Sequence, residues 1–180
     1  MNHSKQEGPP VNRLKPTVWS HLCKGKTKVN DSFRAMPGHL IRRAHQASTA
    51  IFAQEMARQG LDLTPFQFAA LSAIAGEPGL DQASVSARAA VDRATIGGVI
   101  DRLVDKGLVA RQVSQTDRRA RVLTLTDSGA DVLARVQGTI ARVQDTLCAG
   151  LSEADRATLT ALLQRLADNH PRAADDPAAV

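Results

Sequence analysis

Hydrophobic residues in the first third of the chain recur every three to four positions, which is the period of an amphipathic helix. The pattern runs from Pro37 to Gly60 and predicts one long helix there. A second helix is expected to begin after Thr64, because Thr64 can act as its N-cap, Pro65 suits the first helical position and Gln67 can complete a capping box.

Two short helices are expected after a break at residues 76–79. The first spans about 82–90 with Asp81 as its cap, and the second starts after Asp92 and ends near Gly107. Two short helices joined by a tight turn form a helix-turn-helix.

Beyond this motif the hydrophobic period changes from 3.6 to 2, which is the period of a strand. Residues 108–113 and 120–125 read as two strands, and the polar segment 114–119 reads as the turn between them. They predict a β-hairpin with a charged tip. A hairpin directly after a helix-turn-helix is a wing.

Two more helices are expected at the C-terminal side, one starting at Thr126 and one capped by Ser152. The last helix has four leucines on one face: Leu159, Leu162, Leu163 and Leu166. The apolar stripes of the long helices are wider than a small single lobe needs, which favours pairing of two chains over packing within one subunit.

The charge of the chain is unevenly distributed. The formal net charge is +5, and residues 1–36 account for all of it with seven basic and two acidic residues. This segment lacks periodicity and is expected to be a disordered tail, either a basic arm on phosphates or, as we favour, a passive extension. Residues 88–121 hold eight bases and four acids, which is the local basic patch of a DNA-binding surface.

The composition excludes several classes of protein. Aromatic residues make up 3% of the chain, so the core must be aliphatic, and no run of about 18 apolar residues is present to span a membrane. Two cysteines, Cys23 and Cys148, are too few for a disulfide framework, which favours the cytoplasm. The scattered histidines show no metal-ligand spacing, and no nucleophile elbow or phosphate loop occurs. We therefore expect no enzyme activity, metal or cofactor.

Five segments together resemble the MarR family of transcriptional regulators. They are Asp92–Ile96, Asp101–Leu103, Lys106–Val109, Asp117–Ala120 and Leu123–Thr126. The Asp-Arg-Arg-Ala wing tip followed by a Leu-Thr strand is the most specific part. The resemblance implies a mainly α fold with a small β-hairpin wing, in an intertwined homodimer that binds successive major grooves of a pseudo-palindromic double-stranded DNA.

The expected organisation follows from these elements. It is a disordered basic tail (1–36), a helical dimerisation region (37–60 and 127–168), a winged helix-turn-helix (61–126) and a frayed C-terminal tail (169–180).

The second helix of the motif is expected in the major groove, where arginine and threonine can contact base edges. Its candidate residues are Arg93, Thr95, Gly97, Gly98 and Arg102. Each glycine costs about 1 kcal/mol in a helix relative to alanine. Either the backbone approaches the DNA at the glycine pair, or the helix packs closely against the preceding one.

The wing and the first helix of the motif supply the remaining DNA candidates. By resemblance, Arg119 enters the minor groove with Asp117 as its orienting partner and Arg118 beside it. A solvated charged tip is the alternative. Phosphate contacts and the rest of the basic surface are assigned to Ser84, Ser86, Arg88 and Arg121.

Three segments, 37–43, 65–68 and 78–81, are similar to the MarR subgroup that controls aromatic-acid and nicotinate catabolism. The similarity implies release of the DNA by a small aromatic carboxylate such as hydroxynicotinate. The candidate ligand residues are His39, Arg43, His45, Gln46, Phe66 and Phe68. His39 and Arg43 share a helix face, where Arg43 could pair with a carboxylate and His39 could donate to it.

Alternatives remain for these residues and for the function. The Arg–His face could be a solvated or subunit-bridging surface, and the two phenylalanines could belong to the core. A redox switch through Cys23 or Cys148 and a sequence-neutral DNA-binding protein are the competing functions.

Overall fold

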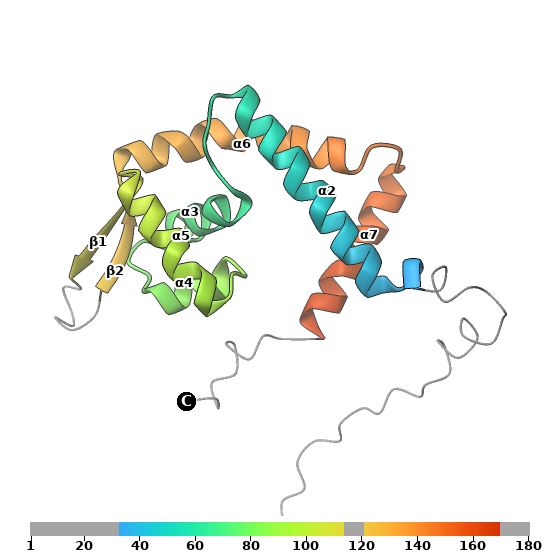
Figure 1. Ribbon diagram of the computed structural model, residues 1–180, viewed down its shortest axis with the longest axis horizontal. Coiled ribbons are helices and arrows are strands. Elements are labelled where there is room, and N and C mark those ends of the chain that lie inside the picture. Colours follow the sequence, from blue (N-terminus) through green and yellow to red (C-terminus); the bar gives the residue numbers. More distant parts are fainter. Residues whose placement is uncertain (1–32, 114–120, 170–180) are drawn as a thin grey trace, which may run out of the picture. The chain divides into compact units, whose positions relative to one another are not determined.

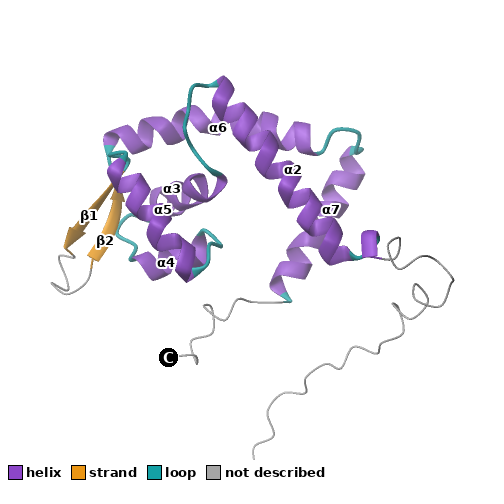
Figure 2. Cartoon of the chain, in the orientation of Figure 1, coloured by secondary structure: helices purple, strands orange, loops and turns teal. Residues whose placement is uncertain are grey.

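The computed structural model describes residues 33–113 and 121–169. Its elements are α2 (Pro37–Arg58), α3 (Pro65–Gly76), α4 (Gln82–Arg88), α5 (Arg93–Asp105), β1 (Val109–Val113), β2 (Arg121–Leu125), α6 (Asp127–Leu147) and α7 (Glu153–Asp168) (Figure 1). Helices dominate and the two strands form one hairpin, which confirms the expected fold class (Figure 2). The chain divides into two compact units, and the boundary lies between His45 and Gln46.

The helices begin where the sequence predicts. Thr64 accepts a hydrogen bond from the Gln67 backbone nitrogen at 3.2 Å, and the Gln67 side chain accepts one from the Thr64 nitrogen at 3.0 Å, so the capping box of α3 is complete. Asp81 and Asp92 are the N-caps of α4 and α5, and their side chains accept from the backbone nitrogens of Ser84 and Thr95 without a capping box. These side chains satisfy backbone N–H groups that a helix start leaves without partners.

The hairpin is antiparallel, with Val109 opposite Leu125. A short third segment adds to it, because the Gly79 nitrogen donates to the Leu123 carbonyl at 3.0 Å and the Leu123 nitrogen donates to the Leu80 carbonyl at 2.8 Å. The connection between α3 and α4 is therefore fixed to β2.

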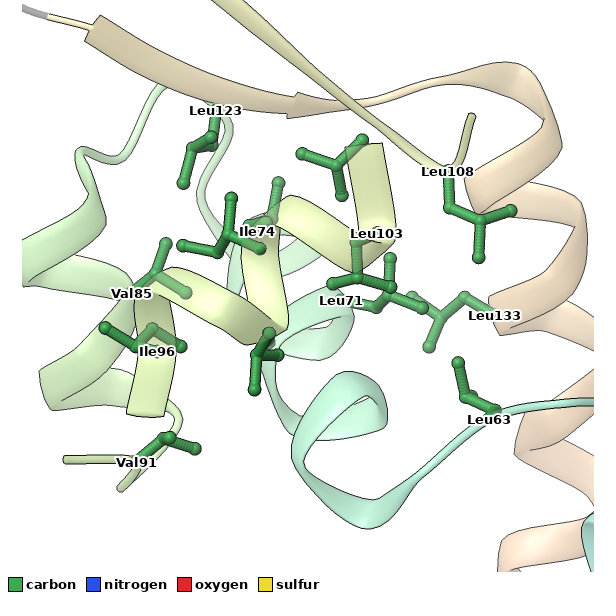
Figure 3. Close-up of a cluster of buried hydrophobic side chains, with 14 of the residues drawn as sticks. Leu63, Leu71, Ile74, Val85, Val91, Ile96, Leu103, Leu108, Leu123 and Leu133 are labelled. Carbon is green, nitrogen blue, oxygen red and sulfur yellow. The ribbon is translucent and has the colours of Figure 1, made fainter. Parts of the chain in front are cut away.

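The core of the second unit forms around α3, which contacts α4, α5, α6 and β2. Leu71 and Ile74 of α3 lie in one cluster with Leu103 of α5 and Leu123 of β2 (Figure 3). Each of the four is at most 2% exposed. Full burial of one such side chain contributes roughly 1.5–3 kcal/mol, so the cluster holds the helix-turn-helix and the hairpin together as one body.

The start of α6 is tied to the end of α5. Thr126 caps α6 by accepting from the Gly129 nitrogen at 3.0 Å. Its hydroxyl also donates to the Gly107 carbonyl at 2.7 Å, and its nitrogen donates to the Leu108 carbonyl at 3.1 Å. One residue thus connects the long helix α6 to the segment that follows α5.

Helix α7 differs from the other helices of the second unit because none of its residues is buried. Its four leucines at 159, 162, 163 and 166 are between 40% and 55% exposed. They occupy one face, so an apolar stripe of this helix has no cover within the described part of the chain. None of the described helices combines the length and apolar character that crossing a membrane requires.

Candidate nucleic-acid interface

The turn of the helix-turn-helix is held by a buried serine. The Ser86 hydroxyl donates to the Val91 carbonyl at 2.6 Å, and the Val91 nitrogen donates to the Ser86 carbonyl at 3.1 Å. Between them Ala90 adopts a left-handed conformation with φ of 51°, which a non-glycine residue rarely takes. The two hydrogen bonds and the burial of Val91 maintain this conformation and set the direction in which α5 leaves the turn.

This geometry corrects the expected role of Ser86. Its side chain is buried and its hydroxyl is used inside the protein, so the predicted phosphate contact by Ser86 is wrong. Ser84 is half-buried at the surface of the first turn of α4 and stays a candidate for such a contact. Arg88 forms an ion pair with Glu77, and both side chains are half exposed.

Helix α5 buries one side and presents the other. The buried residues are Ile96, Val99, Ile100 and Leu103. Arg93, Gly98 and Arg102 lie among the exposed residues of the same helix. Because buried positions recur every three to four residues, Gly98 and Arg102 lie on the side of α5 that faces away from the core, whereas Arg93 is exposed as the first residue of the helix.

Neither glycine of α5 is required by packing among the residues that the structure describes. A Cβ atom at Gly98 would meet nothing within 4 Å, and one at Gly97 would meet only the Gln82 Nε2 atom at 3.5 Å, an ordinary contact. Neither residue has a positive φ. Close packing against the preceding helix therefore does not require the glycine pair, and the approach of the α5 backbone to DNA stays a prediction.

Thr95 is partly engaged by the cap of its own helix. Its hydroxyl donates to the Asp92 Oδ2 atom at 2.8 Å, and its backbone nitrogen donates to Oδ1 at 2.8 Å. The Thr95 hydroxyl and then its backbone N–H lower the pKa of Asp92 from its usual value. The hydroxyl proton is thus used, and the methyl group and the oxygen lone pairs remain for a partner.

Two ion pairs fix α5 to its neighbours. Arg111 of β1 contacts Asp101 of α5 at 2.5 Å. At the C-cap of α5, Lys106 contacts the Asp62 carboxylate at 2.8 Å, and this hydrogen bond, followed by the charge of Lys106, lowers the pKa of Asp62. Both pairs are largely exposed, so they orient the elements more than they stabilise them.

Three other arginines of the basic patch differ from Arg88 and Arg111 in their ion pairing. Arg93, Arg102 and Arg121 form no ion pair with any residue in the ranges 33–113 and 121–169. All three side chains are exposed. Their positive charges are therefore available to an anionic partner such as the phosphate backbone of DNA. Asp117, Arg118 and Arg119 lie outside the described residues, so the minor-groove contact stays a prediction.

Comparisons with known proteins identify the family of the chain. The sequence pattern of the MarR family matches residues 59–120. A protein of Thauera aromatica named for regulation of its hcr operon is 36% identical over 138 residues, which cover 77% of this chain and 82% of that protein. The transcriptional repressor NicR of Pseudomonas putida is 33% identical over 136 residues, 76% of this chain and 85% of NicR. The chain belongs to the MarR family.

Solved structures of other MarR family proteins share the fold. BpsR of Bordetella bronchiseptica, whose structure concerns regulation of DNA binding by 6-hydroxynicotinic acid, superposes with a TM-score of 0.71 at 32% identity and covers 76% of this chain and 96% of its own. PcaV of Streptomyces coelicolor, solved with its natural ligand, superposes with a TM-score of 0.69 at 36% sequence identity. The match covers 76% of this chain and 94% of PcaV. This MarR family protein is therefore a transcriptional regulator, and the expected aromatic-acid subgroup is confirmed by these relatives.

The six predicted ligand residues of this MarR family member are divided between the two units. In the first unit the His39 ring packs against Phe33 in a tilted arrangement, with ring centroids 4.6 Å apart, and its Nδ1 atom is buried without a hydrogen-bond partner among the described residues. Arg43 and His45 of the same unit are exposed. A site that combines these residues with those of the second unit stays a prediction.

In the second unit the two phenylalanines differ. Phe68 is half-buried and packs against Phe52 with ring centroids 6.0 Å apart, so it belongs to the core as the alternative interpretation held. Phe66 is 44% exposed and is not part of the core. Gln46 is also exposed. A cavity of about 380 Å³ between α3, β2 and α6 includes none of the three.

One buried carboxylate, paired with two exposed arginines, was not predicted from the sequence. Glu55 of α2 is 6% exposed and forms ion pairs with Arg58 and with Arg142 of α6, the latter at 3.6 Å. Arg142 also donates to the buried Thr139 hydroxyl at 3.0 Å. The signal available in the sequence was Glu55 itself, an acidic residue at an apolar position of the helical pattern of residues 37–60. No group of three potential metal ligands occurs in the described part of the chain.

Proposed function

We propose that the protein is a ligand-responsive repressor that binds a pseudo-palindromic operator as a homodimer and leaves it when a small aromatic carboxylate such as hydroxynicotinate binds. The exposed face of α5 is the observation that carries the proposal. Arg93 and Arg102 are exposed there without ion pairs in the described chain, and the glycine pair that lies between them in the sequence is not required by packing among the described residues. The same proposal places the protein in the cytoplasm.

Operator binding is tested by selecting preferred duplexes from a randomised pool with the full chain. Affinity is then measured by mobility shift at one fixed salt concentration, because phosphate contacts make affinity salt-dependent. We expect the selected duplex to bind at least about a hundredfold tighter than a scrambled duplex of equal length. We expect Arg93→Ala to lose about tenfold in affinity for the selected duplex. Equal affinity for selected and scrambled duplexes would instead identify a sequence-neutral DNA-binding protein.

The homodimer is supported by α7. The stripe of Leu159, Leu162, Leu163 and Leu166 is half exposed, and contiguous exposed apolar surface of this kind is typical of a protein interface. We expect Leu162→Glu to convert the dimer into monomers in light scattering, since it buries a charge in the interface. Ala161→Glu, on the opposite face of α7, is the matched control. A wild-type monomer would contradict this part of the proposal.

The effector is tested with 6-hydroxynicotinic acid, the compound named with the BpsR structure. Release requires that the ligand prefers a dimer conformation that fits the operator poorly, because equal affinity for both conformations shifts nothing. We expect the compound to raise the unfolding temperature and to dissociate the DNA complex. Arg43→Ala should abolish both effects, whereas Arg42→Ala, its exposed neighbour on α2, should leave them intact. Unchanged ligand affinity in Arg43→Ala would place the ligand elsewhere.

A further inference from the structure

A hollow of about 330 Å³ lies between the two helices of the helix-turn-helix. It is lined by Gln82, Ala83 and Ser86 from α4 and by Arg93 and Ile96 from α5. Gln82 and Arg93 are the first residues of their helices, and both are exposed. A molecule that reaches Arg93 at this surface therefore also lies beside Gln82.

The Gln82 amide extends toward α5 at a position that has no side chain of its own. A Cβ atom built on Gly97 would have the Gln82 Nε2 atom as its nearest neighbour, at 3.5 Å. Gly97 follows Arg93 by one helical turn, so the two lie on the same side of α5. The Gln82 amide of α4 thus lies next to the position on α5 that a side chain of residue 97 would occupy.

We propose that Gln82 is a specificity-determining residue, whose amide recognises one base edge in the major groove where Gly97 offers no side chain. The proposal rests on the operator binding proposed above. A glutamine amide carries one acceptor and two donor hydrogens, and this pair of functions matches the N7 acceptor and N6 donor of adenine. The lack of a side chain at Gly97 leaves the amide room at that edge.

A contact with the phosphate backbone is the competing role for an exposed amide. Phosphate contacts position a protein on the duplex but carry no base preference, so their loss weakens binding to all sequences alike. A base contact is lost at one position only. The two roles therefore differ in the pattern of affinities over a set of operator variants.

The experiment uses the full chain and a set of duplexes derived from the selected operator, in which each base pair of a half-site is replaced in turn. Wild type should prefer an A·T pair at one position of each half-site. Gln82→Ala should lose that preference by roughly five- to 150-fold, the range that a bidentate pair gives, and keep the others. Gln82→Glu should change the preferred pair at this position to C·G, because a carboxylate accepts from the cytosine amino group.

Several results would overturn the proposal. A uniform loss across the set with Gln82→Ala would assign the amide to a phosphate, and an unchanged profile would assign it no contact. Gln59→Ala, a glutamine outside α4 and α5, is the matched control and should match wild type. Thermal unfolding verifies that each variant folds. A wild-type protein without any base preference would contradict the proposed operator binding itself. This result differs from the loss of the Gln82 role alone, in which wild type keeps its base preferences.

Discussion

Gly129, near the start of α6, lies against the backbone of Leu108: a Cβ atom at Gly129 would be 2.0 Å from the Leu108 carbonyl oxygen. Two non-bonded heavy atoms cannot approach so closely, and the obstacle is main chain that no side-chain rotation can move. The absence of a side chain at Gly129 therefore sets how closely α6 docks on the segment that follows α5. Because Thr126 also bonds to Gly107 and Leu108, this junction is fixed at several points.

We expect Gly129→Ala to lower the free energy of unfolding by roughly 1–3 kcal/mol, the usual effect of overpacking, because α6 must move away from Leu108. Urea unfolding of the purified protein measures it. Gly138→Ala in the same helix is the control: its Cβ would meet nothing within 4 Å, so the helix should gain about 0.5–1 kcal/mol. Equal stability of the two variants would contradict the close contact at Gly129.

The buried hydrogen bond of Ser86 leads to a second prediction. Ser86→Ala leaves the Val91 carbonyl without its side-chain donor in the interior, and we expect a loss of about 1–3 kcal/mol in unfolding free energy. Ser128→Ala, at an exposed position in the first turn of α6, should leave stability nearly unchanged. If Ser86→Ala instead kept full stability while DNA affinity fell, the serine would act at the DNA and not in the turn.

The sequence predicted the parts of the fold that depend on local pattern. The caps at Thr64, Asp81 and Asp92 were identified because a helix start needs particular side chains at fixed spacing, whatever lies around it. The change of hydrophobic period predicted the start of β1 to within one residue and the end of β2 at the observed residue, Leu125. The exposure of Arg102 followed from the helical period of α5, and that of Arg93 from its place at the helix start.

The features that escaped the sequence depend on contacts between distant segments. A serine in a short helix can face phosphates or the interior, and only the turn geometry decides that Ser86 is inside. The bridge from Leu80 to Leu123 joins segments 43 positions apart and leaves no local pattern. Gln82 was missed because its importance comes from its neighbour Gly97 on another helix.

The aspartate caps predict a dependence of stability on pH. The Ser84 backbone N–H, the first cause, and then the Ser84 hydroxyl lower the pKa of Asp81, and Thr95 lowers the pKa of Asp92. A carboxyl whose pKa is lowered on folding stabilises the protein above its unfolded pKa of about 3.9. That contribution disappears as the pH falls through the lower, folded pKa.

We therefore expect the variant Asp81→Asn with Asp92→Asn to lose less stability than wild type between pH 5 and pH 2, since asparagine also caps helices but does not titrate there. Urea midpoints across this pH range provide the measurement. At pH 7 the asparagine variant should stay close to wild type, whereas Asp81→Ala alone should lose about 1 kcal/mol. The prediction fails if both asparagine and wild-type proteins lose stability in parallel.

The glycine pair of α5 gives a prediction in which stability and DNA affinity change in opposite directions. Gly98 is exposed and open, so Gly98→Ala should raise the unfolding free energy by about 0.5–1 kcal/mol through its higher helix propensity. If the α5 backbone approaches the DNA there, the added methyl group meets the duplex and operator affinity should fall by tenfold or more. Gly76→Ala, an equally open position at the end of α3, is the control and should leave affinity unchanged. Unfolding measurements and mobility shifts on the same preparations separate the two effects, and a Gly98→Ala protein that binds the operator as tightly as wild type would show that the backbone of α5 keeps its distance from the bases.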